Sequence, residues 1–141
     1  MKRHATAVWS GNLKEGKGKL DTQSGVLSGH PYSFAARFTD ESGKSATNPE
    51  ELLAASHAGC FAMQLSHFLA ENGTPAKRLE ATATVELVPG TGITGSALVL
   101  NAEVPGIAKA KFDELTAKAK AECPISKALG AIKVSLDAKL V

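Results

Sequence analysis

The feature that most constrains the fold is a long apolar segment that follows a clear helix start signal. Asn48 suits the N-cap position, Pro49 the first helical position and Glu51 the third, which together make an Asn variant of the capping box. Asn72 and Gly73 are typical of a helix end. The sequence therefore predicts one helix over residues 49–71.

Apolar side chains occur around most of this helix rather than along one stripe. They are Leu52, Leu53, Ala54, Ala55, Ala58, Phe61, Ala62, Met63, Leu65, Phe68 and Leu69. Such a helix must be buried on most sides, and a sheet in a small domain covers only one of them. A second subunit is the most economical cover for the rest, so we predict a homodimer.

Alternating apolar and polar residues before the helix indicate β-strands. The alternation predicts strands over residues 5–10 and 32–38, with a short strand at 19–22 inside the glycine-rich piece that separates them. That piece contains no phosphate-binding fingerprint.

After the helix, the pattern predicts a β-hairpin, two helical segments and a last strand. The hairpin strands are expected at 81–87 and 98–104, the helices at 109–121 and 124–129, and the last strand at 132–140. The predicted fold class is α+β with a mainly antiparallel sheet, in a single domain over residues 1–141.

Composition excludes several classes of protein. The formal net charge is only +2 and the basic residues are scattered among acids, so we expect neither nucleic acid nor a membrane surface as a partner. No segment approaches the roughly 18 apolar residues of a membrane span, and the first residues lack an apolar leader region. Two cysteines are too few for a secreted disulfide scaffold, so we expect a cytoplasmic protein.

The two cysteines have different local settings. Cys60 lies on the long helix in a polar stripe with His57, Gln64 and His67. Taken alone, a cysteine in an apolar helix is most often an inert core residue, because burial raises its pKa, and a nearby cation would be needed to form a thiolate. Cys123 precedes Pro124 and is expected to be an N-cap, where free N–H groups favour an anion.

Two such thiols together suggest redox chemistry. A thiolate that attacks a peroxide becomes a sulfenic acid, which a second thiol can trap as a disulfide. Two alternatives remain. A zinc site would have to gather both cysteines and two histidines from His4, His30, His57 and His67, without any metal-binding spacing in the sequence. A cysteine hydrolase would use His57 as its base, although we interpret His57 as a satisfied interface histidine.

The run over residues 48–61 resembles the signature of the osmotically inducible protein C (OsmC) family, whose sister group is the organic hydroperoxide resistance proteins. Arg37 and the histidine three residues before Cys60 favour the osmotically inducible branch. Further segments match in the family's order over nearly the whole chain, which argues against chance similarity: residues 9–11, 24–27, 36–38, 104–107 and 119–126.

The resemblance implies an intertwined homodimer with a long buried central helix, acting as a thiol-dependent peroxidase in oxidative stress defence. Cys60 would attack the organic hydroperoxide, or hydrogen peroxide, and Cys123 would be the resolving thiol. Arg37 would hold the thiolate and the departing oxyanion, and Glu50 would orient Arg37. No cofactor or metal is implied; an external dithiol, dihydrolipoamide or a lipoylated protein, would reduce the disulfide. The competing hypothesis is a non-catalytic binding dimer of the same fold.

Helix geometry adds a condition to these roles. Glu50 and Cys60 are ten residues apart on the predicted helix, which is about 15 Å along its axis and too far for both to serve one site in the same subunit. If both belong to one site, Glu50 must come from the partner subunit.

Overall fold

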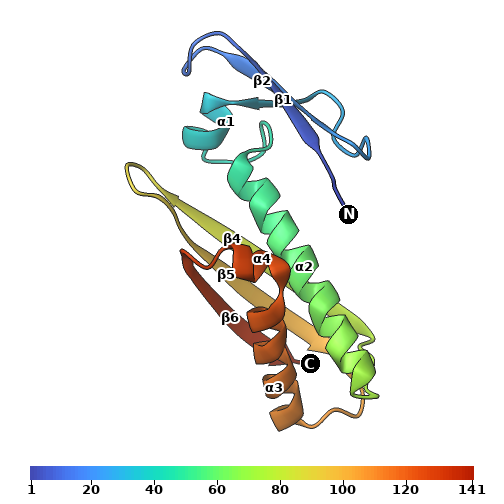
Figure 1. Ribbon diagram of the computed structural model, residues 1–141. Coiled ribbons are helices and arrows are strands. Elements are labelled where there is room, and N and C mark those ends of the chain that lie inside the picture. The colour runs from blue at the N-terminus through green and yellow to red at the C-terminus, as the bar shows by residue number, and fades with distance from the viewer. The chain divides into compact units, whose positions relative to one another are not determined.

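The computed structural model describes residues Met1–Val141, which form two compact units. The N-terminal unit is Met1–Leu52 and the C-terminal unit is Leu53–Val141. Helix α2 (Pro49–Glu71) starts in the first unit and continues in the second. Figure 1 shows the elements in chain order. None of the helices is both long and apolar enough to cross a membrane.

The N-terminal unit contains a three-stranded antiparallel sheet of β1 (Ala5–Ser10), β2 (Lys17–Thr22) and β3 (His30–Ser33). The strands predicted at residues 5–10 and 19–22 are confirmed as β1 and β2. Trp9 and Tyr32 pack with ring centroids 5.3 Å apart on this sheet. Gly18 lies under the Tyr32 ring, where an added Cβ would be only 2.2 Å from a ring carbon. The close packing of Tyr32 on β2 therefore requires a glycine.

The predicted strand over 32–38 is wrong in its second half, because the chain turns at Ser33 into the short helix α1 (Phe34–Phe38). The Ser33 hydroxyl accepts a hydrogen bond from the Ala36 N–H at 3.1 Å and caps this helix. Phe34 and Phe38 then lie one helical turn apart, with ring centroids at 4.8 Å. The aromatic spacing that looked like strand alternation also fits a helical turn, and the serine cap decides between the two.

Helix α2 begins and ends where the sequence predicts. The Asn48 side chain accepts a hydrogen bond from the Glu51 N–H at 2.8 Å, as expected of an N-cap. At the other end Gly73 has a φ of +75°, and the Thr74 N–H donates to the Leu69 carbonyl at 3.0 Å. This is the bond pattern of a helix that ends at a left-handed glycine.

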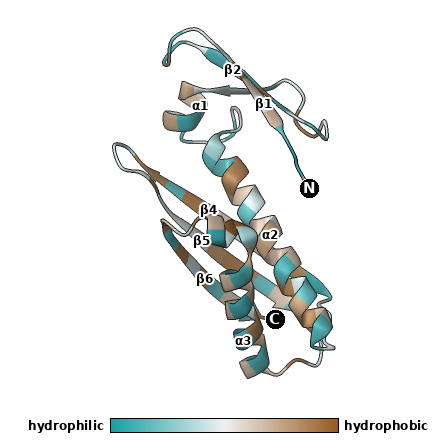
Figure 2. Cartoon of the chain, viewed as in Figure 1, coloured by the Kyte–Doolittle hydropathy of each residue, from teal (hydrophilic) through white to brown (hydrophobic).

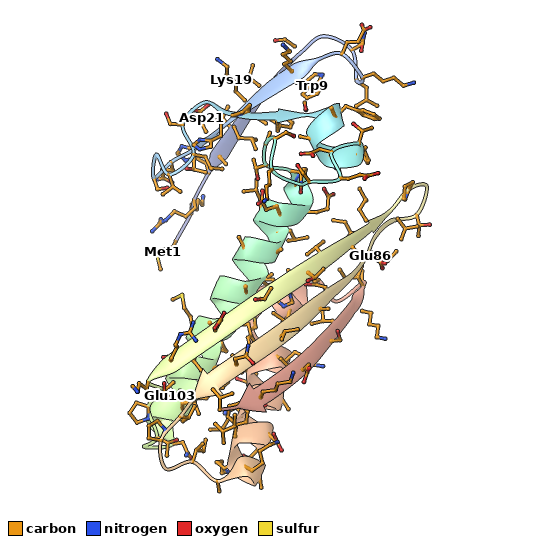
Figure 3. The ribbon with its side chains drawn as sticks, turned by 180° about the vertical axis from the view of Figure 1, so that it is seen from behind. Met1, Trp9, Lys19, Asp21, Glu86 and Glu103 are labelled. Carbon is orange, nitrogen blue, oxygen red and sulfur yellow. The ribbon has the colours of Figure 1, made fainter.

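The C-terminal unit contains a second three-stranded sheet, with two longer helices and a short one. Its strands are β4 (Arg78–Val88), β5 (Gly92–Glu103) and β6 (Lys133–Leu140), in the order β4-β5-β6. The hairpin β4-β5 is antiparallel as predicted, with Glu86 towards its turn and Glu103 at the opposite end of β5 (Figure 3). Strand β6 pairs with β5 in parallel. The α+β class with mostly antiparallel pairing is confirmed.

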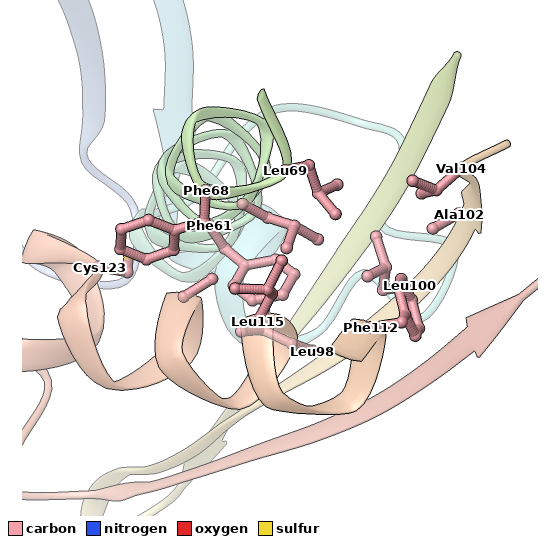
Figure 4. Close-up of a cluster of buried hydrophobic side chains, with 12 residues drawn as sticks. Phe61, Phe68, Leu69, Leu98, Leu100, Ala102, Val104, Phe112, Leu115 and Cys123 are labelled. Atoms are coloured by element: carbon pink, nitrogen blue, oxygen red, sulfur yellow. The ribbon is translucent and has the colours of Figure 1, made fainter. Parts of the chain in front are cut away.

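Helices α2 and α3 (Lys109–Glu122) cover one face of this sheet, and α4 (Pro124–Ala128) follows α3 directly (Figure 1). Apolar and polar residues alternate along β4 and β5, so that one side of the sheet supplies the core (Figure 2). The buried cluster between these elements is drawn in Figure 4: Phe61, Leu65, Phe68, Leu69, Leu98, Leu100, Ala102, Val104, Phe112, Leu115, Ala119 and Cys123.

Within one chain, α2 is covered on one side only. Its buried residues are His57, Phe61, Leu65, Phe68 and Leu69. The other side presents Ala55, Gly59 and Met63 to solvent, with Met63 76% exposed. The all-round apolar character noted in the sequence is thus not satisfied by one subunit.

Candidate active site

The structure brings the two cysteines together in the C-terminal unit. Cys60 is half-buried on α2, and Cys123 is completely buried between α3 and α4. Their Sγ atoms are in hydrogen-bond contact at 3.0 Å, and neither is in a disulfide. Cys123 belongs to the same core cluster as Phe61, so the contact is fixed by the packing of α2 on α3 (Figure 4).

Cys123 ends one helix and starts the next. Its N–H donates to the Ala119 carbonyl at 2.9 Å at the end of α3, and its Sγ accepts the Ser126 N–H at 3.5 Å at the start of α4. Pro124 occupies the first position of α4. The prediction of Cys123 as an N-cap is confirmed, and the result is a sulfur placed at free backbone donors.

The environment affects the two thiols in opposite directions. Burial raises the pKa of Cys60, and its hydrogen bond to Cys123 raises it further. Burial also acts to raise the pKa of Cys123, but hydrogen bonding with Cys60 and with Ser126 outweighs it, so the net direction is downward. In this arrangement the negative charge of a singly ionised pair is held better on Cys123.

Cys60 therefore lacks a cation in its own unit. The only group that lowers its pKa is the Ile125 N–H at the start of α4. A nucleophilic Cys60 at neutral pH needs a positive charge close to its sulfur, as the sequence argument also required.

His57 is completely buried and has a serine on each ring nitrogen. Nδ1 lies 2.7 Å from Ser96 Oγ, and Nε2 lies 2.9 Å from Ser126 Oγ. His57 is satisfied, as expected, but inside the chain rather than at an interface. Burial lowers the pKa of the His57 imidazole, which favours its neutral form. Because both nitrogens are engaged by serines, neither is left to act as the base of a cysteine hydrolase.

Arg37 and Glu50 form a bidentate ion pair within the N-terminal unit. Arg37 Nη2 donates to Glu50 Oε1 at 2.6 Å, and Arg37 Nε lies 3.1 and 3.2 Å from the two carboxylate oxygens. Arg37 is in the last turn of α1 and Glu50 in the first turn of α2, rather than Arg37 on a strand as expected. The fork geometry leaves one guanidinium nitrogen, Nη1, free to donate to another group.

A cavity of about 260 Å³ lies beside Arg37 in the N-terminal unit. Its walls are mainly apolar and aromatic: Trp9, Leu13, Tyr32, Ser33, Phe34, Arg37, Phe38, Thr47, Asn48 and Pro49. Phe34 and Phe38 line this cavity, whereas Phe61 and Phe68 belong to the core of the C-terminal unit. An apolar pocket with one cationic group can hold an alkyl chain that ends in a polar head.

The zinc alternative finds no support in the geometry. No three side chains of the His, Cys, Asp or Glu type are gathered as a metal site. His57, the histidine nearest to Cys60 in the chain, is bonded on both nitrogens.

Sequence reasoning missed Ser96 and the role of Ser126. Ser96 lies in phase with Leu98 and Leu100 on the apolar side of β5, and a lone serine at such a position is a signal for a buried hydrogen bond. Ser126 stands two residues after Pro124, where its N–H reaches back to the cap residue and its hydroxyl is free to bind another element. Nothing in the sequence links either serine to His57, 39 and 69 residues away from it respectively.

Comparison with known proteins agrees with this geometry. The family model described as OsmC-like protein matches residues 41–137. The peroxiredoxin OsmC of Escherichia coli (strain K12) is 46% identical over 137 residues, covering 95% of this chain and 93% of that protein. The chain belongs to the OsmC family.

Members of the sister group are also similar to this OsmC-family chain. The organic hydroperoxide resistance protein OhrA of Bacillus subtilis (strain 168) is 36% identical over 99 residues, 67% of this chain and 68% of that protein. The crystal structure of OhrB of Bacillus subtilis has a TM-score of 0.69 at 29% identity, over 96% of this chain and 98% of that one. The resemblance read from the sequence is confirmed.

Proposed function

We propose that this OsmC-family chain is a thiol-dependent peroxidase that reduces organic hydroperoxides, with Cys60 as nucleophile and Cys123 as resolving thiol. The observation that carries the proposal is the 3.0 Å contact between the two sulfurs. Relatives named peroxiredoxin and organic hydroperoxide resistance protein support the activity.

In the first step the Cys60 thiolate attacks the terminal oxygen of the hydroperoxide. A sulfur–oxygen bond forms and the O–O bond breaks, so that Cys60 becomes a sulfenic acid and the alkoxide leaves as an alcohol after taking up a proton. The mainly apolar cavity beside Arg37 suits the alkyl group of such a substrate.

In the second step the sulfur of Cys123 attacks the Cys60 sulfur. A disulfide forms, the sulfur–oxygen bond breaks, and hydroxide leaves as water with the proton that Cys123 gives up. Because the two sulfurs are already in contact, only a small shift is needed to form the bond. An external dithiol, dihydrolipoamide or a lipoylated protein, then reduces the disulfide, and no bound cofactor takes part.

Arg37 supplies the cation that Cys60 lacks in its own unit, and Glu50 orients it. The bidentate pair fixes the guanidinium and leaves Nη1 for the thiolate and the departing alkoxide. Glu50 and Cys60 are ten residues apart on α2, about 15 Å of helical rise. Arg37 and Glu50 therefore serve the Cys60 of a partner subunit, and the enzyme is a homodimer.

The exposed side of α2 is suited to that partner. Small residues at Ala55 and Gly59 permit close approach of another backbone, and the exposed Met63 follows them one turn later. A dimer interface on this side would bury the apolar residues of α2 that the rest of the chain leaves exposed.

Cysteine variants test the chemistry. We would follow consumption of cumene hydroperoxide with dihydrolipoamide for the native protein, Cys60→Ser and Cys123→Ser. We expect turnover to be lost in both variants, while Cys123→Ser still reduces about one equivalent of peroxide, because its sulfenic acid forms but is not resolved. If the native protein shows no turnover with any dithiol, the non-catalytic binding dimer is the better description.

Mixed dimers test the shared site. Cys60→Ser and Arg37→Ala subunits, each inactive alone, are unfolded together, refolded and compared with each variant refolded separately. A site built from two subunits restores one intact site in each mixed dimer, and random pairing gives about a quarter of native activity. No recovery from mixed dimers that are shown to have formed would mean that Arg37 and Cys60 act within one subunit.

A further inference from the structure

A buried chain of hydrogen bonds leads to the resolving cysteine. It begins at Ser96 on β5, passes through His57 on α2 and reaches Ser126 on α4, with heavy-atom distances of 2.7 and 2.9 Å. Ser126 contacts Cys123 through its N–H, which lies 3.5 Å from the Cys123 sulfur. His57, Ser96 and Ser126 are all at most 8% exposed, so water does not compete for these bonds.

His57 meets a serine hydroxyl at each ring nitrogen, and a hydroxyl can either donate or accept. A neutral imidazole, which burial favours, therefore keeps both hydrogen bonds in either tautomer. Ser126 is thus tied to α2 through its hydroxyl, while its N–H remains on Cys123.

The chain also fixes the start of α4. Because α4 has only five residues, its own hydrogen bonds are few, and its place depends on contacts with other elements. The bond from His57 ties Ser126 to α2, the same helix that carries Cys60. His57 is one turn before Cys60 on α2. The nucleophilic Cys60 and the histidine that holds Ser126 beside Cys123 therefore lie on the same helix.

We propose that His57 is a positioning residue for resolution: by binding the Ser126 hydroxyl it holds the Ser126 N–H on Cys123 while that sulfur attacks the Cys60 sulfenic acid. The inference rests on the proposed peroxidase function and concerns its second step only. The donor on the Cys123 sulfur favours loss of its thiol proton and so increases the fraction present as the attacking thiolate. As the S–S bond forms, the negative charge passes to the departing hydroxide. The proton departs with the hydroxide from Cys60 as water.

The test separates the two steps in single-turnover experiments. The protein is mixed with one equivalent of cumene hydroperoxide; peroxide loss reports the first step, and disulfide formation, followed by mass spectrometry after acid quench, reports the second. We expect His57→Leu to slow disulfide formation about tenfold, as the loss of one charge-directed hydrogen bond would, and to leave peroxide loss unchanged. His57→Gln, which keeps an N–H donor near the place of Nε2, should recover most of the rate.

Ser126→Ala removes the same hydrogen bond from its other end, so it serves as the matched variant to His57→Leu. It also tests the proposal if His57→Leu does not fold. It should slow disulfide formation as much as His57→Leu does, and the double variant should be no slower, because both changes break the same chain.

Each outcome has a definite meaning. Unchanged disulfide formation in both His57→Leu and Ser126→Ala, or additive effects in the double variant, would overturn the role of His57 and leave the peroxidase function intact. Failure of the native protein to consume the equivalent of peroxide would instead overturn the proposed function itself.

Discussion

The two pairs of candidate residues are built in opposite ways. Arg37 and Glu50 are 13 residues apart and meet on two adjoining short segments, with side chains 34% and 12% exposed. Cys60 and Cys123 are 63 residues apart and meet only because α2 packs on α3, with Cys123 fully buried. The ion pair is thus a local, partly solvent-exposed interaction, whereas the contact between the two thiols depends on the core of the C-terminal unit.

The two units that contain these pairs also differ in how much apolar surface they bury. Ala36 is the only buried apolar residue in the N-terminal unit, whereas the C-terminal unit buries a cluster of twelve residues. A unit with little apolar burial has little stability of its own. The thiol pair is therefore held by the core of its own unit, whereas the ion pair lies in a unit with little core, for which the proposed homodimer would supply a partner surface.

The largest expected effect is on stability, and it tests whether the two units differ in buried core. Phe61→Ala should lower the free energy of unfolding by about 3–5 kcal/mol, because it empties the centre of the core beside Cys60. Phe38→Ala is the control; this ring is 43% exposed and its loss should cost about 1 kcal/mol or less. Urea unfolding followed by circular dichroism measures both. Equal losses would contradict the contrast between the units.

The next effect is on the first chemical step. Arg37→Ala should slow oxidation of Cys60 by cumene hydroperoxide about 10²–10³-fold, because it removes the donor to the developing oxyanion. Its control is Arg78→Ala, an exposed arginine paired with Glu80, which should leave the rate unchanged. Stopped-flow peroxide consumption measures this step. Equal effects of the two changes would mean that general surface charge matters and the ion pair does not.

A smaller effect is expected from the carboxylate that orients the arginine. Glu50→Gln should slow the same step about tenfold, since the amide keeps the shape but loses the charge-assisted fork. Glu51→Gln is a neighbouring control on the same turn; Glu51 accepts its hydrogen bond from the Thr47 hydroxyl. If the rate falls equally in the two variants, the loss comes from disturbing the first turn of α2 and not from breaking the Arg37–Glu50 ion pair.

The smallest effect concerns pH and belongs to the C-terminal unit. Burial lowers the pKa of His57 below its usual 6.5, so the unfolded chain binds more protons than the folded one as the pH falls below that value. Stability should therefore be complete above pH 6.5 and decline as the pH falls through the range below it. His57→Gln should show a flatter dependence in urea unfolding between pH 5 and 7.5. An identical slope in both proteins would contradict this assignment.

Much of the fold could be predicted because its signals are local. The cap at Asn48, the glycine at position 73 and the alternation in β4 and β5 each act within a few residues, and each is confirmed. The strand predicted through Phe38 failed because the hydrogen bond from the Ala36 N–H to the Ser33 side chain outweighed an alternation that also fits a helix.

The candidate site could be predicted only in part. The resemblance named Cys60, Cys123, Arg37 and Glu50, and the structure brings them together as two pairs. The hydrogen bonds of His57 to Ser96 and Ser126 could not be foreseen, because they join β5 and α4 to α2 and depend on tertiary packing. His57 was accordingly assigned to an interface, although it is inside the chain.

The position of Cys123 at the junction of α3 and α4 gives the protein a built-in reporter of its oxidation state. A thiolate at this position is a strong acceptor for the Ser126 N–H, whereas a disulfide sulfur carries no charge and accepts weakly. Oxidation should therefore loosen the first turn of α4, and the Ser126 amide should exchange with deuterium faster in the disulfide form than in the reduced form. A partner that distinguishes the two forms would find the difference at this turn.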